Sequence, residues 1–195
     1  MNNQTHINNP SQKVLVLSGS LKAASVNQKL AVQAGKIALS LGAEVTTISL
    51  RDYNIPLFNE DIEQEEHAAV NDIRATFAAA DALIIASPEY NGSLTPALKN
   101  VIDWVSRPNA ANDYAPRYSR QKAALLSASP GGLGGLRGLT HLREVLTNLG
   151  TLVIPSQLAV PAAYDAFNEN DELINAATKD RLQAIIDQLL KVTIS

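Results

Sequence analysis

The stretch ALIIASPEYNGSLTPALKNVIDW, residues 82–104, decides the fold of this 195-residue chain. Its first six residues, 82–87, are an almost wholly apolar run, which predicts a strand buried on both faces of a parallel sheet. A polar break follows, and Thr95 with Pro96 then marks a helix start. Threonine caps a helix, and the missing N–H of proline costs nothing at the first helical position. Buried strand, polar loop and amphipathic helix are the repeating unit of an α/β fold.

The same unit recurs along the chain. Strands are predicted at 13–18, 44–50, 82–87, 121–129 and 151–160, and helices at 26–41, 67–80, 95–106, 135–149 and 172–190. This alternation predicts a doubly wound, five-stranded parallel sheet of order 2-1-3-4-5 in three α/β/α layers. Pro155 places the last strand at an edge. We predict one domain over 13–195, after a loosely ordered polar tail over 1–12.

The composition excludes several classes of protein. Apolar residues make up 46% and charged residues 18%, with a net charge of -3, so there is no basic stripe for nucleic acid. The chain has no cysteine, and His6, His67 and His141 lack ligand spacing, so no metal site is predicted. No apolar run approaches the ~18 residues that span a bilayer, and the N-terminus lacks a signal-peptide pattern. We therefore expect a cytoplasmic protein without a membrane partner.

Ligands of such sheets bind beyond the carboxyl ends of the strands, where the strand order reverses. In this order the point lies between the first and third strands, so the candidate loops are 19–27, 88–95 and 129–135. The first loop supplies polar groups and one cation just before a helix: Ser20, Lys22, Ser25 and Asn27. Helix N-termini attract anions, so this loop predicts a phosphate site, a role compatible with Ser25 capping the helix.

The second and third loops suit a flat ligand. SPEYNG (87–92) leaves backbone N–H and C=O groups beyond a strand end, and Tyr90 offers a flat surface beside them, as a heteroaromatic ring requires. The alternative is a plain strand–helix turn that uses proline, asparagine and glycine for geometry. In SASPGGLGG (127–135) the glycines either let the backbone approach a ligand or form a flexible connection.

Two features that look like sites are set aside. GGLGGLRG (131–138) fails the dinucleotide pattern G-x-G-x-x-G, because Arg137 stands where the last glycine belongs, and no P-loop motif occurs. Trp104 lies a full helix away from the strand end, which favours the core or a subunit interface.

No catalytic side chain is predicted. Glu89 has no partner carboxylate, so a glycosidase-type pair is unsupported. Asp103 is expected to pair with Arg107 on the helix surface, in an i, i+4 ladder with Lys99. His141 lies within a helix without a nucleophile to activate.

Three segments together resemble the NADPH-dependent FMN reductase family: GSLKAASVNQKL (19–30), SPEYNGSLTPALKNVIDWVSR (87–107) and SPGGLGGLRGLTHLREVL (129–146). These flavodoxin-like proteins include quinone, azo-dye and chromate reductases, and the resemblance runs from about Lys13 to Pro161. The family commonly has arginine at the position of Lys22, so a bidentate phosphate clamp becomes a point charge here. Many members have Pro-Gly where this chain has Thr95-Pro96.

The resemblance implies a set of flavin contacts. Ser20, Lys22, Ser25 and Asn27 would bind the FMN phosphate. The isoalloxazine would be lined, largely through backbone groups, by Pro88, Glu89, Tyr90 and Asn91, with Ser129 closing the other side. The family also implies hydride transfer from NAD(P)H to flavin N5, release to an acceptor on the same face, and a homodimer or homotetramer.

Our hypothesis is therefore an FMN-dependent NAD(P)H oxidoreductase in which the flavin carries the chemistry. NADPH or NADH would be the co-substrate, and the acceptor would be a quinone, a flavin or a similar small molecule. Loops 52–66 and 108–120 are expected to shape the acceptor pocket. The alternatives are a flavodoxin-type electron carrier and a flavin-binding protein without turnover.

Overall fold

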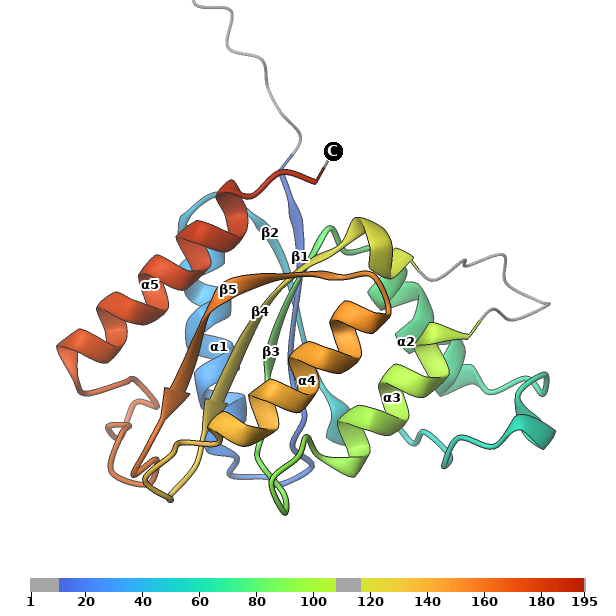
Figure 1. The fold of residues 1–195 in the computed structure, drawn as a ribbon, viewed down its shortest axis with the longest axis horizontal. Coiled ribbons are helices and arrows are strands. Elements are labelled where there is room, and N and C mark those ends of the chain that lie inside the picture. The colour runs from blue at the N-terminus through green and yellow to red at the C-terminus, as the bar shows by residue number, and fades with distance from the viewer. Residues whose placement is uncertain (1–10, 108–116, 195) are drawn as a thin grey trace, which may run out of the picture.

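The computed structural model describes residues 11–107 and 117–194. Within them lies one parallel sheet of order β2-β1-β3-β4-β5, shown in Figure 1. The strands are β1 (Lys13–Ser18), β2 (Glu44–Ser49), β3 (Ala82–Ala86), β4 (Lys122–Ala128) and β5 (Leu152–Val160). The predicted strands and their order are confirmed.

Helices cover both faces of this sheet. They are α1 (Val26–Ser40), α2 (Ala68–Ala78), α3 (Pro96–Ser106), α4 (Leu136–Asn148) and α5 (Ala176–Lys191), with short 3-10 helices at Leu50–Asp52, Glu60–Ile62 and Arg117–Arg120. Helices α1 and α5 pack on one face, and α2, α3 and α4 pack on the other (Figure 1). The predicted three-layer architecture is confirmed. None of the described helices is both long and apolar enough to cross a bilayer.

The core lies in two apolar layers, one on each side of the sheet. Along β1, Val14 and Val16 face α1 and α5, whereas Leu15 and Leu17 face the other three helices. Every residue of β3 and β4 is buried, because both strands are central and are covered on both faces. This double burial explains why the strands are continuous apolar runs rather than alternating ones.

The edge position of β5 accommodates its proline. Ala123 of β4 is opposite Val153, but Leu125 is already opposite Gln157, so β5 bulges around Pro155. The Arg143 guanidinium of α4 donates to the backbone carbonyls of Val153 (3.3 Å) and Ile154 (2.9 Å). These bonds tie α4 to β5 where the ladder is irregular.

The predicted start of the last helix, at residue 172, is wrong. Helix α5 begins at Ala176, and the Asn175 side chain caps it by accepting the Thr178 N–H at 2.9 Å. Leu173 lies before the helix, in an isolated antiparallel bridge with Phe167, and it is buried in the core layer that contacts α1 and α5. The spacing of Leu173 matches the apolar face of α5, which is why the sequence pattern placed the helix start too early. Residues 1–10 of the predicted tail lie outside the described part of the chain.

Candidate functional site

Four loops meet around one pocket at the carboxyl edge of the sheet. They follow β1, β3, β4 and β5. Eight of the nine residues proposed from the sequence line it: Ser20, Lys22, Ser25, Asn27, Pro88, Glu89, Tyr90 and Ser129. The ninth, Asn91, is not among the lining residues, whereas Tyr164 is an addition that the sequence did not suggest.

The loop after β1 directs a helix N-terminus into the pocket. The Ser25 side chain caps α1 by accepting the Gln28 N–H at 3.3 Å, and the Ser20 hydroxyl accepts the Lys22 N–H at 3.2 Å. The first N–H groups of a helix have no intrahelical acceptor, and they carry the positive end of its dipole. With the cation of Lys22 beside them, these donors form a concave site suited to a phosphate.

Asn27 joins this loop to the end of β4. Its amide donates to the Ala128 carbonyl and accepts the Ala128 N–H, both at 2.8 Å, and the residue is only 2% exposed. Both ends of the amide are thereby bonded to backbone 101 residues away. Asn27 lines the pocket, and its side chain fixes two of the pocket loops relative to each other.

The loop after β3 is a tight hairpin set on the end of the strand. Tyr90 and Ser93 exchange backbone hydrogen bonds of 2.9 and 3.0 Å, and Asn91 and Gly92 between them have positive φ angles of 52° and 81°. Positive φ at both central positions is typical of a type I′ turn. The turn places Asn91 at its tip and leaves Pro88, Glu89 and Tyr90 along the pocket.

The predicted cap of α3 also anchors the loop after β1. The Thr95 hydroxyl accepts the Leu98 N–H at 3.2 Å, as the sequence predicts for a capping threonine. The same hydroxyl donates to the Gly19 carbonyl, while the Gly19 N–H donates to the Ala86 carbonyl at 2.9 Å. The first two loops of the site are therefore held together at their bases.

The Glu89 carboxylate is bonded to the first turn of α4. One oxygen accepts the backbone N–H groups of Arg137 (3.0 Å) and Gly138 (3.3 Å), and the other accepts Nε of Arg137 at 2.7 Å. Burial alone would raise the pKa of this carboxyl group, but these donors outweigh burial and hold the pKa below its usual range. Glu89 thus caps α4, whose own N-cap residue, Gly135, has no side chain.

Two of the glycines after β4, Gly134 and Gly135, pack closely against strand ends. A Cβ on Gly134 would lie 2.7 Å from the Val160 backbone carbon, and a Cβ on Gly135 would overlap the Ser127 hydroxyl. Ser129 is held by backbone bonds to Val160 and Ala163, of 3.0 and 3.1 Å. The second half of this loop is therefore closely packed, whereas Gly131 and Gly132 are exposed, and Ser129 and Pro130 line the pocket.

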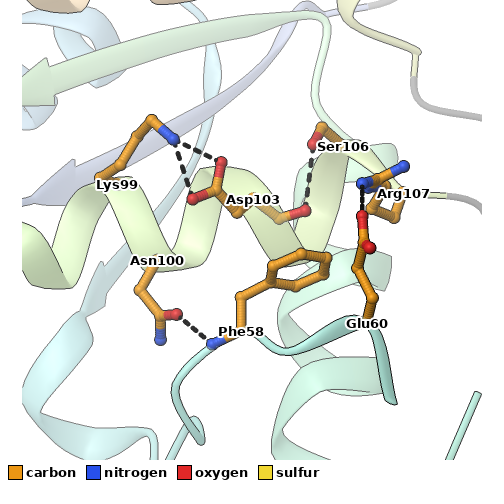
Figure 2. A network of polar contacts seen from close by, with 7 residues as sticks. All are labelled: Phe58, Glu60, Lys99, Asn100, Asp103, Ser106 and Arg107. Atoms are coloured by element: carbon orange, nitrogen blue, oxygen red, sulfur yellow. Dashed lines mark hydrogen bonds and ion pairs between the residues drawn. The ribbon is translucent and has the colours of Figure 1, made fainter. Parts of the chain in front are cut away.

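Other polar groups singled out in the sequence lie elsewhere. On α3, Lys99 pairs with Asp103 at 2.7 Å as predicted, but the expected Asp103–Arg107 pair is wrong (Figure 2). The helix ends at Ser106, so the extended backbone turns Arg107 toward Glu60, at 2.9 Å. His141 is exposed, with Nδ1 3.0 Å from the Ser93 hydroxyl. Trp104 is fully buried in the core, and its indole N–H donates to the Pro56 carbonyl.

Comparisons with known proteins agree with this architecture. Residues 12–165 match the NADPH-dependent FMN reductase family. The chain is 35% identical to an NAD(P)H-dependent FMN reductase of Pseudomonas aeruginosa, over 91% of this chain and 92% of that one. It is 31% identical to an NADPH:quinone oxidoreductase of Arabidopsis thaliana, over 95% and 93% of the two chains. Among solved structures, the flavoenzyme NAD(P)H:(acceptor) oxidoreductase of Paracoccus denitrificans superposes with a TM-score of 0.78 at 25% identity, covering 92% of this chain and 95% of that one.

Proposed function

Because this chain belongs to the NADPH-dependent FMN reductase family, we propose that it is an NAD(P)H-dependent FMN/quinone reductase with its flavin in the pocket at the carboxyl edge. The observation that carries the proposal is the meeting of four strand-end loops around a capped helix N-terminus. In a doubly wound sheet this is where a phosphate-bearing cofactor binds. The net reaction converts NAD(P)H, a proton and a quinone into NAD(P)⁺ and a hydroquinone.

The residues of the pocket fit FMN. A flavin mononucleotide needs an anion site at one end and a flat surface with backbone groups at the other. The first is provided by Lys22, Ser20 and the start of α1, and the second by Pro88 and Tyr90. Tyr90 is half exposed, so its ring is accessible to a ligand. We assign the phosphate to the first group and the isoalloxazine to the second, with Ser129 on the opposite wall.

The chain's own groups would bind and orient the cofactor rather than exchange protons with it. FMN, when bound, supplies the two-electron chemistry between nicotinamide and acceptor. Asn27 and Thr95 hold the loops at fixed separation, and Glu89 fixes the end of β3 against α4. Their side chains are bonded within the protein, which suits positioning. A flavin that carries the chemistry would explain why no acid–base pair was found in the sequence.

A second, more apolar pocket beside the first is our candidate for the acceptor. Its lining includes Leu21 of the loop after β1, Pro96 and Ala97 of α3, and three residues of the loop after β2: Tyr53, Ile55 and Leu57. An apolar wall is suited to a quinone ring. The sequence proposed loops 52–66 and 108–120 for this role; the first contributes three of these residues, and residues 108–116 lie outside the described part of the chain.

The proposal is tested with the purified protein. We expect it to bind FMN and to oxidise NADPH or NADH with a benzoquinone in the absence of any partner reductase. Bound flavin that is reduced only through an added reductase would identify an electron carrier, and bound flavin that no reductant turns over would identify a flavin-binding protein. A protein that binds no FMN would overturn the proposal. We further propose a cytoplasmic homodimer or homotetramer, which light scattering at micromolar concentration would test.

A further inference from the structure

Tyr164 stands on a braced turn at the rim of the pocket. The neighbouring Ala163 is fully buried, and its N–H donates to the Ser129 carbonyl at 3.1 Å. Ala162 adopts a positive φ of 46° and accepts the Asp165 N–H at 3.0 Å, which closes a tight turn. The backbone on both sides of Tyr164 is therefore fixed, although the side chain itself is 66% exposed.

The exposed ring of Tyr164 lies near the ammonium group of Lys22, in the loop after β1. The Lys22 ammonium lies 5.6 Å from the ring centroid, within the range of cation–π attraction. Both residues line the pocket, and they come from different strand ends, β1 and β5. A lysine side chain is flexible and binds phosphate as a point charge, without the rigid fork of an arginine. A ring that holds its ammonium in place reduces the entropy lost when the anion binds.

We propose that Tyr164 is a positioning residue that holds the Lys22 ammonium at the phosphate end of the pocket. This inference rests on the proposed flavin function and adds a residue to its binding site. It specifies that the ring acts through Lys22, and that its effect is therefore confined to ligands that carry a phosphate. Riboflavin, which has the same ring system without the phosphate, is the ligand that separates this role from direct stacking on the flavin.

The experiment measures FMN and riboflavin binding to apo-protein by quenching of flavin fluorescence. We expect Tyr164→Leu to weaken FMN binding about two- to fivefold, the range for an exposed cation–π contact, and to leave riboflavin binding unchanged. Tyr164→Phe keeps the ring and is expected to bind FMN as the wild type does. Lys22→Met should weaken FMN binding more, and adding Tyr164→Leu to it should cause no further loss, because the ring then has no cation to hold.

Lys29 provides a matched control. Its ammonium lies 6.0 Å from the Phe167 ring centroid and pairs with Asp171, outside the pocket. Lys29→Met removes the same charge next to an aromatic ring and should leave FMN binding unchanged. Thermal unfolding of the apo-variants checks that each is folded. We expect the Tyr164 variants to fold, because the side chain is exposed.

Several results would overturn the inference. Equal losses of FMN and riboflavin in Tyr164→Leu would mean that the ring contacts the flavin directly, and a loss in Tyr164→Phe would mean that the hydroxyl acts on the ligand. Additive losses in the double variant, or no loss in Tyr164→Leu, would also contradict it. A wild-type protein that binds neither flavin would instead overturn the proposed function and, with it, this inference.

Discussion

The amino edge of the sheet, where the strands begin, and the carboxyl edge, where they end, share buried polar braces but differ in their exposed polar groups. At the amino edge, the Gln121 amide donates to the carbonyls of Phe77 (2.6 Å) and Ala80 (2.9 Å), and the Lys122 ammonium donates to those of Leu190 (3.2 Å) and Val192 (2.6 Å). Both side chains are directed at backbone carbonyls that end α2 and α5. The cation at this edge is thus 4% exposed and is bonded within the fold.

The carboxyl edge has the same kind of braces, together with exposed groups around the pocket. Asn27 is 2% exposed and the Glu89 side chain 8% exposed, and both are bonded to backbone, as Gln121 and Lys122 are at the other edge. Lys22 and Tyr164, in contrast, are exposed at the rim. Burial of a polar side chain at a strand end therefore does not by itself indicate a site; what distinguishes the carboxyl edge is that exposed groups lie beside the buried Ser20 and Ser25.

Asn27→Leu should produce the largest effect. It removes both partners of the Ala128 peptide groups and leaves a buried N–H and a buried carbonyl unpaired, at about 1–3 kcal/mol each. We expect the free energy of unfolding in urea to fall by about 3 kcal/mol. FMN affinity should fall as well, because two pocket loops lose their connection.

The control for this change is Gln33→Leu on the same helix. Gln33 is half-buried and donates one bond to the Asp171 carbonyl, at 3.1 Å. Its removal should change stability by less than about 0.5 kcal/mol. Equal losses of unfolding free energy in the two variants would contradict the prediction that the Asn27–Ala128 bonds stabilise the fold more than the single bond of Gln33.

Lys122→Met is the equivalent change at the amino edge. We expect a loss of about 2 kcal/mol in unfolding free energy, because two carbonyls at the end of α5 lose a charged donor. FMN affinity should remain that of the wild type, since the variant lies at the opposite edge from the pocket. A loss of FMN affinity as large as that of Asn27→Leu would contradict the prediction that side chains at the amino edge stabilise the fold without affecting the pocket.

The sequence was sufficient for the parts of the fold that local patterns determine. Apolar runs, and for β2 a β-branched run, identified the five strands, and Ser25, Thr95 and Pro96 marked helix starts that the structure shows. The strand-end rule selected the loops, the family resemblance named residues within them, and eight of the nine residues line one pocket.

Long-range contacts were beyond the sequence. The Glu89 cap on α4 joins residues 48 positions apart, and nothing near Glu89 indicates its partner. One indirect signal exists: α4 begins after Gly135, which has no side chain, so an acceptor had to come from elsewhere. Tyr164 was missed because only three strand-end loops were considered, although the loop after β5 reaches the same edge.

Glu89→Gln should have a moderate, pH-dependent effect. The folded-state pKa of this carboxyl group lies below its usual value, so the folded protein binds fewer protons than the unfolded chain in the acid range. The stabilisation is therefore fully present above about pH 4.3, the unfolded pKa, and is lost as pH falls through the folded-state pKa. We expect wild type and variant to differ by about 1 kcal/mol at pH 7, and by less at pH 3.

Glu144→Gln, an exposed change on α4, the helix that Glu89 caps, is the control for Glu89→Gln. It should leave the unfolding free energy within about 0.5 kcal/mol of the wild type at both pH values. A Glu89→Gln difference that stayed constant between pH 7 and pH 3 would show that the carboxylate charge does not act at the helix N-terminus.

Arg107→Gln should have the smallest effect, although its ion pair is conspicuous in Figure 2. The Arg107–Glu60 pair is 2.9 Å long, but the two side chains are 45% and 74% exposed. Exposed pairs of this kind contribute about 0.2–1 kcal/mol and are screened by salt. We expect a loss below about 0.5 kcal/mol that shrinks further in 0.5 M NaCl, measured in a double-mutant cycle with Glu60→Gln. A coupling as large as the effect of Lys122→Met would mean that geometry, rather than burial, decides which polar contacts stabilise this fold.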